Sequence, residues 1–362
     1  MTTKRAGARR RPRVAIATNN GDIGGGEVML LAIAEAMRTL GIEVVVLGPR
    51  APGDLVAEAA RRGFEVTTVS ASSRAAYMAH LALWRARHPR TPLWCNGLVP
   101  SLATAPFGRR IVHLHSLPSG WGQRASAAPA RVRAAATLVP SHAVARKVPG
   151  SRVLENWTAP IDASHMVPLA ERPARIGYLG RLTASKGVAD LGAALADLNE
   201  RGRGLTLVVG GASRHARAGD DAELSRALER LGDAVEYLGW VSPADFFPQI
   251  DILVVPSRAF ETFGLVVAEA LGYGVPVVVS DAGALAEVAG PDHPWVFPAG
   301  DAEALGAVLE EALETWDARA ARVRERGRDR WTTMYSPQAG LRRLQTTLTT
   351  LAPATSSDKD GL

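Results

Sequence analysis

Short apolar runs recur along the chain, and most are followed by a longer stretch with the period of a helix. Runs of this length that are rich in Val, Ile and Leu and bounded by Gly or Pro are typical of buried strands in parallel sheets. Two series of such runs are separated by a stretch with three prolines at 158–173. The alternation predicts an α/β protein with two doubly wound, Rossmann-like parallel sheets.

The boundaries of the expected elements follow from these runs. The expected strands lie at 13–18, 43–47, 64–69, 93–96, 111–115 and 136–140, and then at 175–179, 205–209, 235–238, 252–255, 275–279 and 295–297. The expected helices include 27–40, 55–62, 74–87, 187–199, 222–231, 243–249, 264–272 and 302–326. The predicted organisation is a tail at 1–12, a domain at 13–160, a linker at 161–173, a domain at 174–335, a final helix at 336–351 and a tail at 352–362.

The stretch from Asp251 to Ser280 reads as strand, helix and strand, and it contains two carboxylates. Glu261 lies in the loop after the first strand, and Glu269 lies on the helix. Loops at the carboxyl ends of parallel strands bind ligands, and free N–H groups near Gly264 at the start of the helix favour an anion. Eight residues of helix separate two groups by roughly 12 Å, which exceeds the separation in a glycosidase pair. The two acids therefore fit opposite ends of one ligand, and two solvated surface glutamates are the alternative.

A second loop, from Gly180 to Gly187, joins a predicted strand to a predicted helix and carries Arg181 and Lys186. Arg can bind two phosphate oxygens at once, and Lys adds a point charge. The spacing of a Walker loop is absent. The loop predicts a site for a phosphate group, with solvated surface charges as the alternative.

The first half of the chain carries a glycine run and two histidines at expected strand ends. Gly24, Gly25 and Gly26 follow the first strand, but they do not form the G-x-G-x-x-G pattern of dinucleotide binding. His113 and His115 lie two residues apart on an expected strand and so face the same side. No third metal ligand is evident nearby in the sequence. A structural histidine is the common alternative to a functional one at such a place.

Composition and charge exclude several classes of protein. The chain has 362 residues, a formal net charge of +6 and one cysteine, Cys95, so it has no internal disulfide framework. Six basic residues and no acidic ones fall within residues 1–13, and the remaining basic residues equal the 36 acidic ones in number. A neutral body argues against nucleic-acid binding. The charge of the basic tail suits phosphates or anionic lipid, but membrane contact is not expected, and a solvated start is the favoured interpretation. No apolar run in the sequence has the length of a membrane span or of a signal-peptide core. We therefore expect a cytoplasmic enzyme.

Together these motifs resemble the retaining glycosyltransferases of family 4, which have the GT-B fold. The E-x7-E motif matches Glu261 and Glu269, and the pattern E-x-F-G-L matches Glu261-Thr262-Phe263-Gly264-Leu265. The pattern G-R-x-x-x-x-K-G matches Gly180 to Gly187, and looser matches are G-G-x-E at Gly24 and a P-S segment at Pro140. The family usually has Gly after the Asn of its v-x-x-N pattern, where this chain has Trp157. That tryptophan is expected either to line an acceptor pocket or to pack between domains. The resemblance covers about residues 13–345.

The resemblance implies two Rossmann-like domains facing a cleft, with the last helix crossing back onto the first domain. It implies metal-independent transfer without a cofactor, in which Arg181 and Lys186 neutralise the donor diphosphate and Glu269 binds the ribose. Glu261 contacts the donor sugar, and His115 faces the reacting sugar, with His113 as the alternative if the register differs. The implied catalytic residues are His115, Arg181, Lys186 and Glu261. The implied donor-binding residues are Gly25, Gly26, Gly180, Arg181, Lys186, Glu261, Thr262, Phe263, Gly264, Leu265 and Glu269.

The function expected from the sequence is a hexosyltransferase-type enzyme that uses a nucleotide-sugar donor. UDP is the expected nucleotide and GDP the next, and the acceptor is expected to be a small molecule such as a natural-product core. The alternatives are a lipid- or polysaccharide-directed transferase of the same family, a nucleotide-sugar epimerase, and an inactive sugar-nucleotide-binding subunit. The sequence leaves the acceptor, the linkage and the oligomeric state open.

Overall fold

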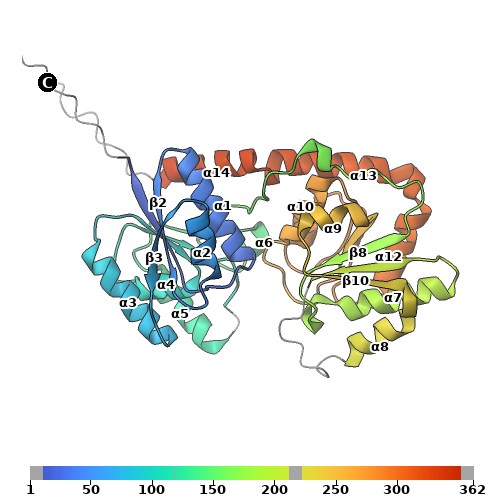
Figure 1. Ribbon diagram of the computed structural model, residues 1–362, viewed down its shortest axis with the longest axis horizontal. Helices are drawn as coiled ribbons and strands as arrows, with labels where there is room; N and C mark the ends of the chain where they lie inside the picture. Colours follow the sequence, from blue (N-terminus) through green and yellow to red (C-terminus); the bar gives the residue numbers. More distant parts are fainter. Residues whose placement is uncertain (1–10, 119, 212–221, 352–362) are drawn as a thin grey trace, which may run out of the picture. The chain divides into compact units, whose positions relative to one another are not determined.

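The computed structural model describes residues 11–118, 120–211 and 222–351 of the chain. The predicted tails lie outside these residues, apart from Arg11 and Pro12. The chain divides into two compact units. The N-terminal unit comprises the chain up to Pro140, Val148–Leu154 and the residues from Leu341 on, and the C-terminal unit comprises Ser141–Lys147 and Glu155–Gly340. Figure 1 labels the elements of each.

The N-terminal unit is built on a seven-stranded sheet in the order β3-β2-β1-β4-β5-β6-β7, and every neighbouring pair is parallel. Its strands are β1 (Arg13–Thr18), β2 (Glu43–Pro49), β3 (Glu65–Val69), β4 (Leu93–Asn96), β5 (Arg110–His113), β6 (Ala136–Val139) and β7 (Arg152–Val153). Its helices are α1 (Gly25–Thr39), α2 (Asp54–Arg61), α3 (Arg74–Arg87), α4 (Leu98–Ala103) and α5 (Trp121–Arg131), and the final helix α14 (Pro337–Leu351) belongs to it from Leu341 on.

The C-terminal unit is built on a six-stranded sheet in the order β10-β9-β8-β11-β12-β13, again with every pair parallel. Its strands are β8 (Arg175–Leu179), β9 (Thr206–Gly210), β10 (Val235–Gly239), β11 (Ile252–Val255), β12 (Val277–Ser280) and β13 (Val296–Phe297). Its helices are α6 (His142–Ala145), α7 (Val188–Glu200), α8 (Ala222–Leu231), α9 (Pro243–Phe246), α10 (Leu265–Tyr273), α11 (Leu285–Ala289), α12 (Ala302–Glu314) and α13 (Trp316–Arg330).

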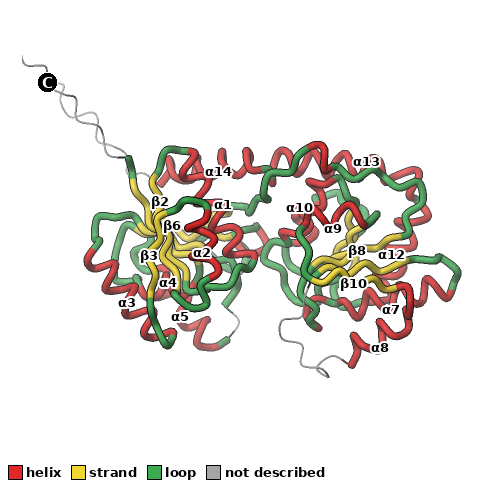
Figure 2. The backbone as a smooth tube through the Cα atoms, viewed as in Figure 1, coloured by secondary structure: helices red, strands yellow, loops and turns green. Residues whose placement is uncertain are grey.

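Each sheet is covered by helices on both faces, as Figure 2 shows. Burial on both faces explains why the central strands are apolar throughout: all four residues of β11 and of β12 are buried. The predicted fold class of two Rossmann-like parallel-sheet domains is confirmed. One detail of the prediction was wrong, because the strand expected at 111–115 ends at His113. The stretch expected to be largely helical at 302–326 is helical, and it consists of two helices that meet at Thr315.

Both sheets have a point at which the strand order reverses. In the N-terminal unit it lies between β1 and β4, and in the C-terminal unit it lies between β8 and β11. The loops that leave the carboxyl ends of two such strands run in opposite directions, and the crevice between them is where α/β proteins bind ligands. The loops after these four strands are therefore the places to look for a site.

Candidate functional site

In the C-terminal unit, the loops after β8 and β11 meet through a charged pair. Lys186 Nζ lies 2.5 Å from Glu261 Oε1. The Ser257 hydroxyl donates to the same carboxylate oxygen at 2.6 Å. The Lys186 and Glu261 side chains are 26% and 19% exposed, so the pair is partly desolvated and still reachable by a ligand. The structure therefore brings together two residues that the sequence placed in separate loops.

The backbone holds these two loops against each other. The carbonyl oxygen of Ser185 accepts from the backbone N–H groups of Arg258 and Ala259, at 3.0 and 3.1 Å. Gly187 has a φ of +68°, and a Cβ there would lie 1.8 Å from the carbonyl oxygen of Pro256. A side chain at this position would clash with backbone, which cannot move aside as a flexible side chain can. Only glycine allows this conformation and this approach together.

A partly buried ion pair also holds the two loops together. The Arg258 guanidinium donates from Nε to Asp190 Oδ2 at 2.7 Å, and its NH2 group donates to the other oxygen at 2.5 Å. Asp190 is 5% exposed and lies in the first turn of α7. A two-point arginine–carboxylate contact fixes orientation as well as distance. The loop after β11 is thus anchored to the helix that follows the loop after β8.

Arg181 lies in the loop after β8 with its side chain exposed. Its carbonyl oxygen accepts from the Tyr178 hydroxyl at 2.6 Å, which fixes the backbone there. Burial, together with the nearby Glu261 carboxylate, raises the pKa of Tyr178, so that hydroxyl stays protonated and donates. Within the described ranges, the Arg181 guanidinium makes no hydrogen bond or ion pair. The Gly180 N–H donates to the carbonyl of Gly210 at 2.9 Å, so this N–H group is already used by the sheet.

Helix α10 begins beside Glu261. Its N-cap, Gly264, has a φ of +91°, and a Cβ there would lie 2.5 Å from Leu285 Cδ2. The first N–H groups of a helix have no partner within the helix and suit an anion. Three neighbouring residues were also predicted to contact the donor. Phe263 is buried against the Tyr335 ring, and Leu265 is half-buried beside the core. The Thr262 carbonyl accepts from the Ser141 hydroxyl at 2.8 Å. Phe263 therefore offers a ligand only its backbone.

Glu261 also belongs to the sheet through its backbone. It forms an isolated parallel bridge with Gly283, and its carbonyl accepts from the Ala284 N–H at 2.9 Å. Gly283 has a φ of +70°. The bridge follows β11 and β12, so the carboxylate stands on a continuation of the sheet rather than on a free loop.

Glu269 lies one turn further along α10 and is half-buried. Burial raises the pKa of its carboxyl to about 8. Among the described residues, this carboxyl has no hydrogen-bond or ion-pair partner. A buried carboxylate without a donor is costly, so the group is suited to the hydroxyls of a ligand.

In the N-terminal unit, His115, Asn96 and Gly26 form a neutral polar group. His115 follows the end of β5, Asn96 is the last residue of β4, and Gly26 lies in the first turn of α1. His115 Nε2 lies 2.6 Å from Asn96 Oδ1, and the Asn96 amide donates to the Gly26 carbonyl at 3.3 Å. Because Oδ1 is the acceptor, we assign the imidazole proton to Nε2. Burial lowers the pKa of His115 to about 4, so the ring is neutral at pH 7. A Cβ on Gly26 would lie 3.3 Å from that of His115, whereas Gly25 faces open space.

The two histidines differ in access. His113 has no exposed surface and packs against the rings of Trp94 and His115. His115 follows the end of β5 and is half-buried. Burial lowers the pKa of both. Of the two, His115 is therefore the one that a ligand of the N-terminal unit can reach.

Two further residues from the sequence motifs have local roles. Glu27 is 7% exposed and accepts from the Gly24 N–H at 3.2 Å, so it caps its own helix. Trp157 is 3% exposed, and its ring lies where a Cβ on Gly340 of α14 would come within 2.2 Å. Trp157 thus packs on a helix and does not line an open pocket.

The sequence interpretation missed Ser257, Asn96 and the Arg258–Asp190 pair. Asn96 had a signal, because it is the last residue of an expected strand next to the switch point. Ser257 and Arg258 had none beyond their nearness to Glu261. Among the described residues, no group of three or more His, Cys, Asp or Glu side chains is placed to hold a metal ion. Metal independence stays a prediction.

The site residues thus fall into two sets, one in each unit. Arg181, Lys186, Glu261, Glu269 and the start of α10 share the switch point of the C-terminal sheet. Gly25 and Gly26 follow β1 at that of the N-terminal sheet, and His115 follows the neighbouring strand β5 and contacts Asn96 at the end of β4. The first set offers cations, helix N–H groups and carboxylates, which suits a ligand that carries both phosphates and hydroxyls. The second offers neutral hydrogen-bonding groups.

Comparisons with known proteins agree with this chemistry. Residues 173–315 match the family model described as glycosyl transferases group 1, which is less than half of the chain. A glycogen synthase of Mycobacterium tuberculosis is 35% identical over 190 residues, which are 49% of this chain and 45% of the relative. A phosphatidyl-myo-inositol mannosyltransferase of Mycolicibacterium smegmatis is 32% identical over 151 residues, 40% of this chain and 38% of the relative. The chain spans less than half the length of these curated relatives.

The fold as a whole is similar to that of solved glycosyltransferase structures. The Anabaena protein HepE, solved in complex with UDP-glucose, superposes with a TM-score of 0.78 at 19% identity, over 93% of this chain and 99% of that one. Sucrose-phosphate synthase from Thermosynechococcus elongatus gives a TM-score of 0.74 at 20% identity, over 94% and 99%. At these identities the likeness establishes the fold. None of the described helices has the length and apolar character needed to cross a bilayer.

Proposed function

We propose that this protein is a retaining, metal-independent glycosyltransferase that moves a hexose from a nucleotide sugar to a small-molecule hydroxyl. The observation that carries the proposal is the cluster at the switch point of the C-terminal sheet, where Lys186 and Glu261 meet beside Arg181 and the start of α10. This cluster lies within the residues that match the glycosyltransferase family model. The UDP-glucose bound by the similarly folded HepE supports a UDP-sugar as the donor.

The chemical task is to stabilise a departing nucleoside diphosphate. The bond from the sugar C1 to the β-phosphate oxygen breaks, and a bond from the acceptor oxygen forms on the same face of the sugar. The acceptor proton passes to the departing phosphate oxygen, so no side chain has to act as the base. Arg181, Lys186 and the N–H groups at the start of α10 offset the charge that develops on that oxygen.

The pair of Lys186 and Glu261 explains how one residue serves phosphate and the other serves sugar. Lys186 and Ser257 both donate to Oε1 of Glu261. Oε2 has no partner among the described residues, and we assign it to a hydroxyl of the donor sugar. Lys186 then bridges the carboxylate and the diphosphate, which fixes the position of its ammonium group.

Glu269 is assigned to the ribose hydroxyls. In the free protein its carboxyl has a pKa of about 8, so it is mostly protonated at pH 7. Two hydroxyl donors would favour the carboxylate and lower that pKa. Donor binding should therefore release a proton below pH 8. In the N-terminal unit, His115 is the residue that we assign to contact with substrate, because it is reachable and neutral.

Binding measurements test the proposal first. Thermal unfolding of the purified protein is followed with UDP-, GDP-, ADP- and dTDP-sugars, each with and without EDTA. A ligand that binds only the native state at 100 times its Kd stabilises it by about 2.7 kcal/mol. We expect one nucleotide class to stabilise the protein, with no loss on EDTA. Stabilisation that EDTA removes would contradict metal independence, and no stabilisation by any nucleotide would contradict the donor site.

A second acceptor class follows from the relatives. One is described as a glycogen synthase and another as a phosphatidyl-myo-inositol mannosyltransferase, which indicates polymer and lipid acceptors. Once the donor is known, product formation is compared with soluble hydroxylated small molecules, with glucans and with lipid vesicles. Turnover of the donor without any acceptor, to an isomeric sugar, would indicate an epimerase instead.

A further inference from the structure

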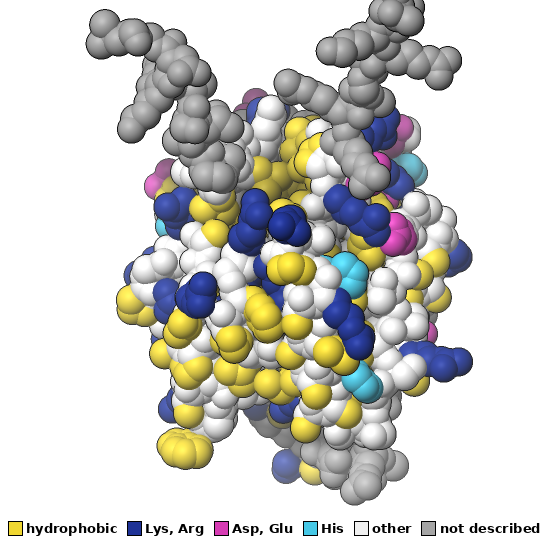
Figure 3. Space-filling model, turned by 90° about the vertical axis from the view of Figure 1, so that its left-hand side faces the viewer, with side chains coloured by type: hydrophobic (Ala, Val, Ile, Leu, Met, Phe, Trp, Pro, Cys, Tyr) yellow, Lys and Arg dark blue, Asp and Glu magenta, His cyan; other side chains and the backbone are white. Residues whose placement is uncertain are grey.

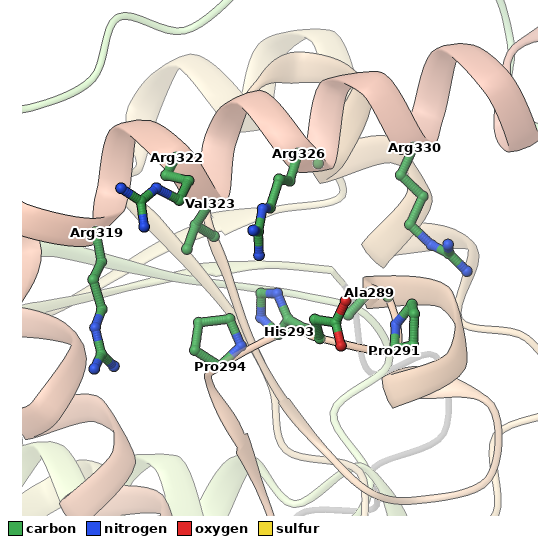
Figure 4. Close-up of a pocket in the computed structure, with 12 residues that line it drawn as sticks. Ala289, Pro291, His293, Pro294, Arg319, Arg322, Val323, Arg326 and Arg330 are labelled. Atoms are coloured by element: carbon green, nitrogen blue, oxygen red, sulfur yellow. The ribbon is translucent and has the colours of Figure 1, made fainter.

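Apart from the candidate site, the C-terminal unit has a pocket between helix α13 and the segment Ala289–Pro294. Its volume is about 310 Å³. Figure 4 shows that α13 forms one wall and that the chain around His293 forms the other. The segment leads into the amino end of β13, whereas the candidate donor residues follow the carboxyl ends of β8 and β11. Because all strands of this sheet are parallel, one site lies at the carboxyl ends of the strands and the other at their amino ends.

Four arginines of α13 line this pocket: Arg319, Arg322, Arg326 and Arg330. Their spacing of three and four residues places them on one face of the helix. In Figure 4 they extend from α13 toward the same side. On the face of the N-terminal unit in Figure 3, by contrast, Lys and Arg side chains are scattered among hydrophobic ones. Like charges at this spacing destabilise a helix, so the row has a cost that a bound anion would offset.

The two outer arginines already have partners. Arg319 forms an ion pair with Glu311 at 2.6 Å, and both side chains are about half exposed. Arg330 donates to the carbonyls of Glu287 and Val288 at 2.7 and 2.9 Å. For the central pair, Arg322 and Arg326, the described part of the chain supplies no hydrogen bond or ion pair. Their guanidinium groups are the ones available to a ligand.

The other charged groups nearby do not neutralise the row. Asp292 is the one carboxylate among the residues that line the pocket. Glu325 and Asp329 lie three residues after Arg322 and Arg326 on α13, and both are exposed and do not line the pocket. The His293 ring bonds to the Val277 carbonyl at 2.8 Å, and burial lowers its pKa, so it adds no charge at pH 7. The residues that line the pocket therefore carry a net positive charge, with four arginines against one carboxylate.

We propose that this pocket binds a small molecule that carries at least one phosphate group. The planar guanidinium forks of Arg322 and Arg326 suit two oxygens of one phosphate. Val323, Pro291 and Pro294 supply an apolar wall for the rest of the ligand. The volume lies at the small end of the range for ligand pockets, which fits a phosphorylated metabolite rather than a polymer.

Calorimetric titration of the full chain with pyrophosphate tests the proposal. Because the candidate donor site also suits pyrophosphate, the titration uses the Arg181→Gln/Lys186→Gln variant as its background. We expect that variant to retain binding, and the further changes Arg322→Gln/Arg326→Gln to weaken it at least tenfold. Arg87→Gln/Arg90→Gln, two exposed arginines of the N-terminal unit, is the control for loss of two charges and should bind as the background does. Asp292→Asn should tighten binding, because it removes the pocket's carboxylate.

Three results would overturn the proposal. One is the absence of pyrophosphate binding in the Arg181→Gln/Lys186→Gln background while each protein unfolds as cooperatively as the wild type. Another is equal weakening by the Arg87/Arg90 control, which would indicate a general charge effect. The third comes from vesicles of phosphatidylglycerol. Vesicle binding that depends on Arg322 and Arg326, without any binding of pyrophosphate, would indicate a lipid surface instead of a small molecule. Failure here would leave the donor site untouched, because the two sites share no residue.

Discussion

The two units use the same topology to build chemically opposite centres. At the switch point of the N-terminal sheet, His115, Asn96 and Gly26 form a neutral hydrogen-bonded group, and burial holds the imidazole uncharged. At the switch point of the C-terminal sheet, Lys186 and Glu261 form a partly exposed ion pair. Arg181 and Glu269 lie in the same set, and neither side chain has a hydrogen-bond or ion-pair partner in the described part of the chain. The difference indicates that the sheet fixes where a site lies and the loops fix its charge.

Removal of Lys186 should have the largest effect on this comparison. Lys186→Ala takes away a cation that offsets charge on the leaving diphosphate, and loss of one such group costs about 10²- to 10³-fold in kcat. It also removes the ion-pair partner of Glu261, whose carboxylate then keeps only the Ser257 hydroxyl as a donor. Turnover and nucleotide affinity are measured in parallel, with Arg172→Ala, an exposed arginine of the same unit, as the control. A kcat equal to that of the wild type would contradict the role of Lys186.

Glu269→Gln should weaken nucleotide binding by roughly tenfold, which is the value of one charge-assisted hydrogen bond. In the wild-type protein, affinity should rise with pH toward the free pKa of about 8 and then level off, because binding favours the carboxylate. Calorimetry in buffers of different ionisation enthalpy should detect the released proton. The variant should show neither the pH dependence nor the proton release. A pH-dependent affinity that survives in the variant would assign the proton to another group.

His115→Ala tests the neutral centre. Because the nucleotide is assigned to the C-terminal unit, we expect its affinity to be unchanged while kcat falls by roughly tenfold, a modest share of what positioning contributes. The matched control is His80→Ala, an exposed histidine on α3. Salt sharpens the distinction, since it should weaken nucleotide binding in every variant and leave the ratio of kcat values unchanged. A fall in nucleotide affinity for His115→Ala would contradict the assignment of nucleotide binding to the C-terminal unit alone.

The smallest effect should appear in stability without ligand. The pKa of His115 is lowered to about 4, below its unfolded value near 6.5. The neutral ring therefore contributes stability above pH 6.5, and this contribution is lost as the pH falls toward 4. For Glu269 the sign is opposite: a raised pKa means that stability falls as the pH rises toward 8.

Urea unfolding at several pH values measures both slopes. Glu269→Gln should gain at least about 1 kcal/mol relative to the wild type between pH 5 and 8. His115→Asn should lose part of the acid sensitivity below pH 6.5, with the rest left to His113, which burial also keeps neutral. Identical pH slopes for the wild type and both variants would show that neither centre is desolvated as described.

Much of the fold could be predicted from the sequence, because the spacing of apolar residues and the length of apolar runs distinguish helices from strands. The strands at 13–18 and 252–255 were placed to the residue. The break between α12 and α13 was not, since Thr315 is no stronger a breaker than residues inside either helix. The sequence also placed the candidate residues Arg181, Lys186 and Glu261 in loops after strands and Glu269 on the following helix, as the structure has them. Their roles stay a prediction.

Contacts between distant residues could not be read in the same way. Lys186 and Glu261 are 75 positions apart, and both belong to loops whose paths depend on the packing of Gly187 on Pro256. His113 and His115 share a spacing that predicts one face of a strand, yet the strand ends at His113 and only His115 reaches the edge. Burial decided between them, and burial is a property of the whole sheet.

The bridge between Glu261 and Gly283 restricts which residues position 283 accepts, in natural variants and in engineered changes to the loop after β11. A Cβ on Gly283 would lie 2.2 Å from the Glu261 carbonyl oxygen, and the φ of +70° already disfavours any other residue. A Gly283→Ala change would thus displace the acid while every charge in the sequence is kept. In a library that randomises residues 258–263 to alter sugar preference, position 283 has to stay glycine. We expect the variant with alanine at this position to be inactive, although alanine is small and uncharged.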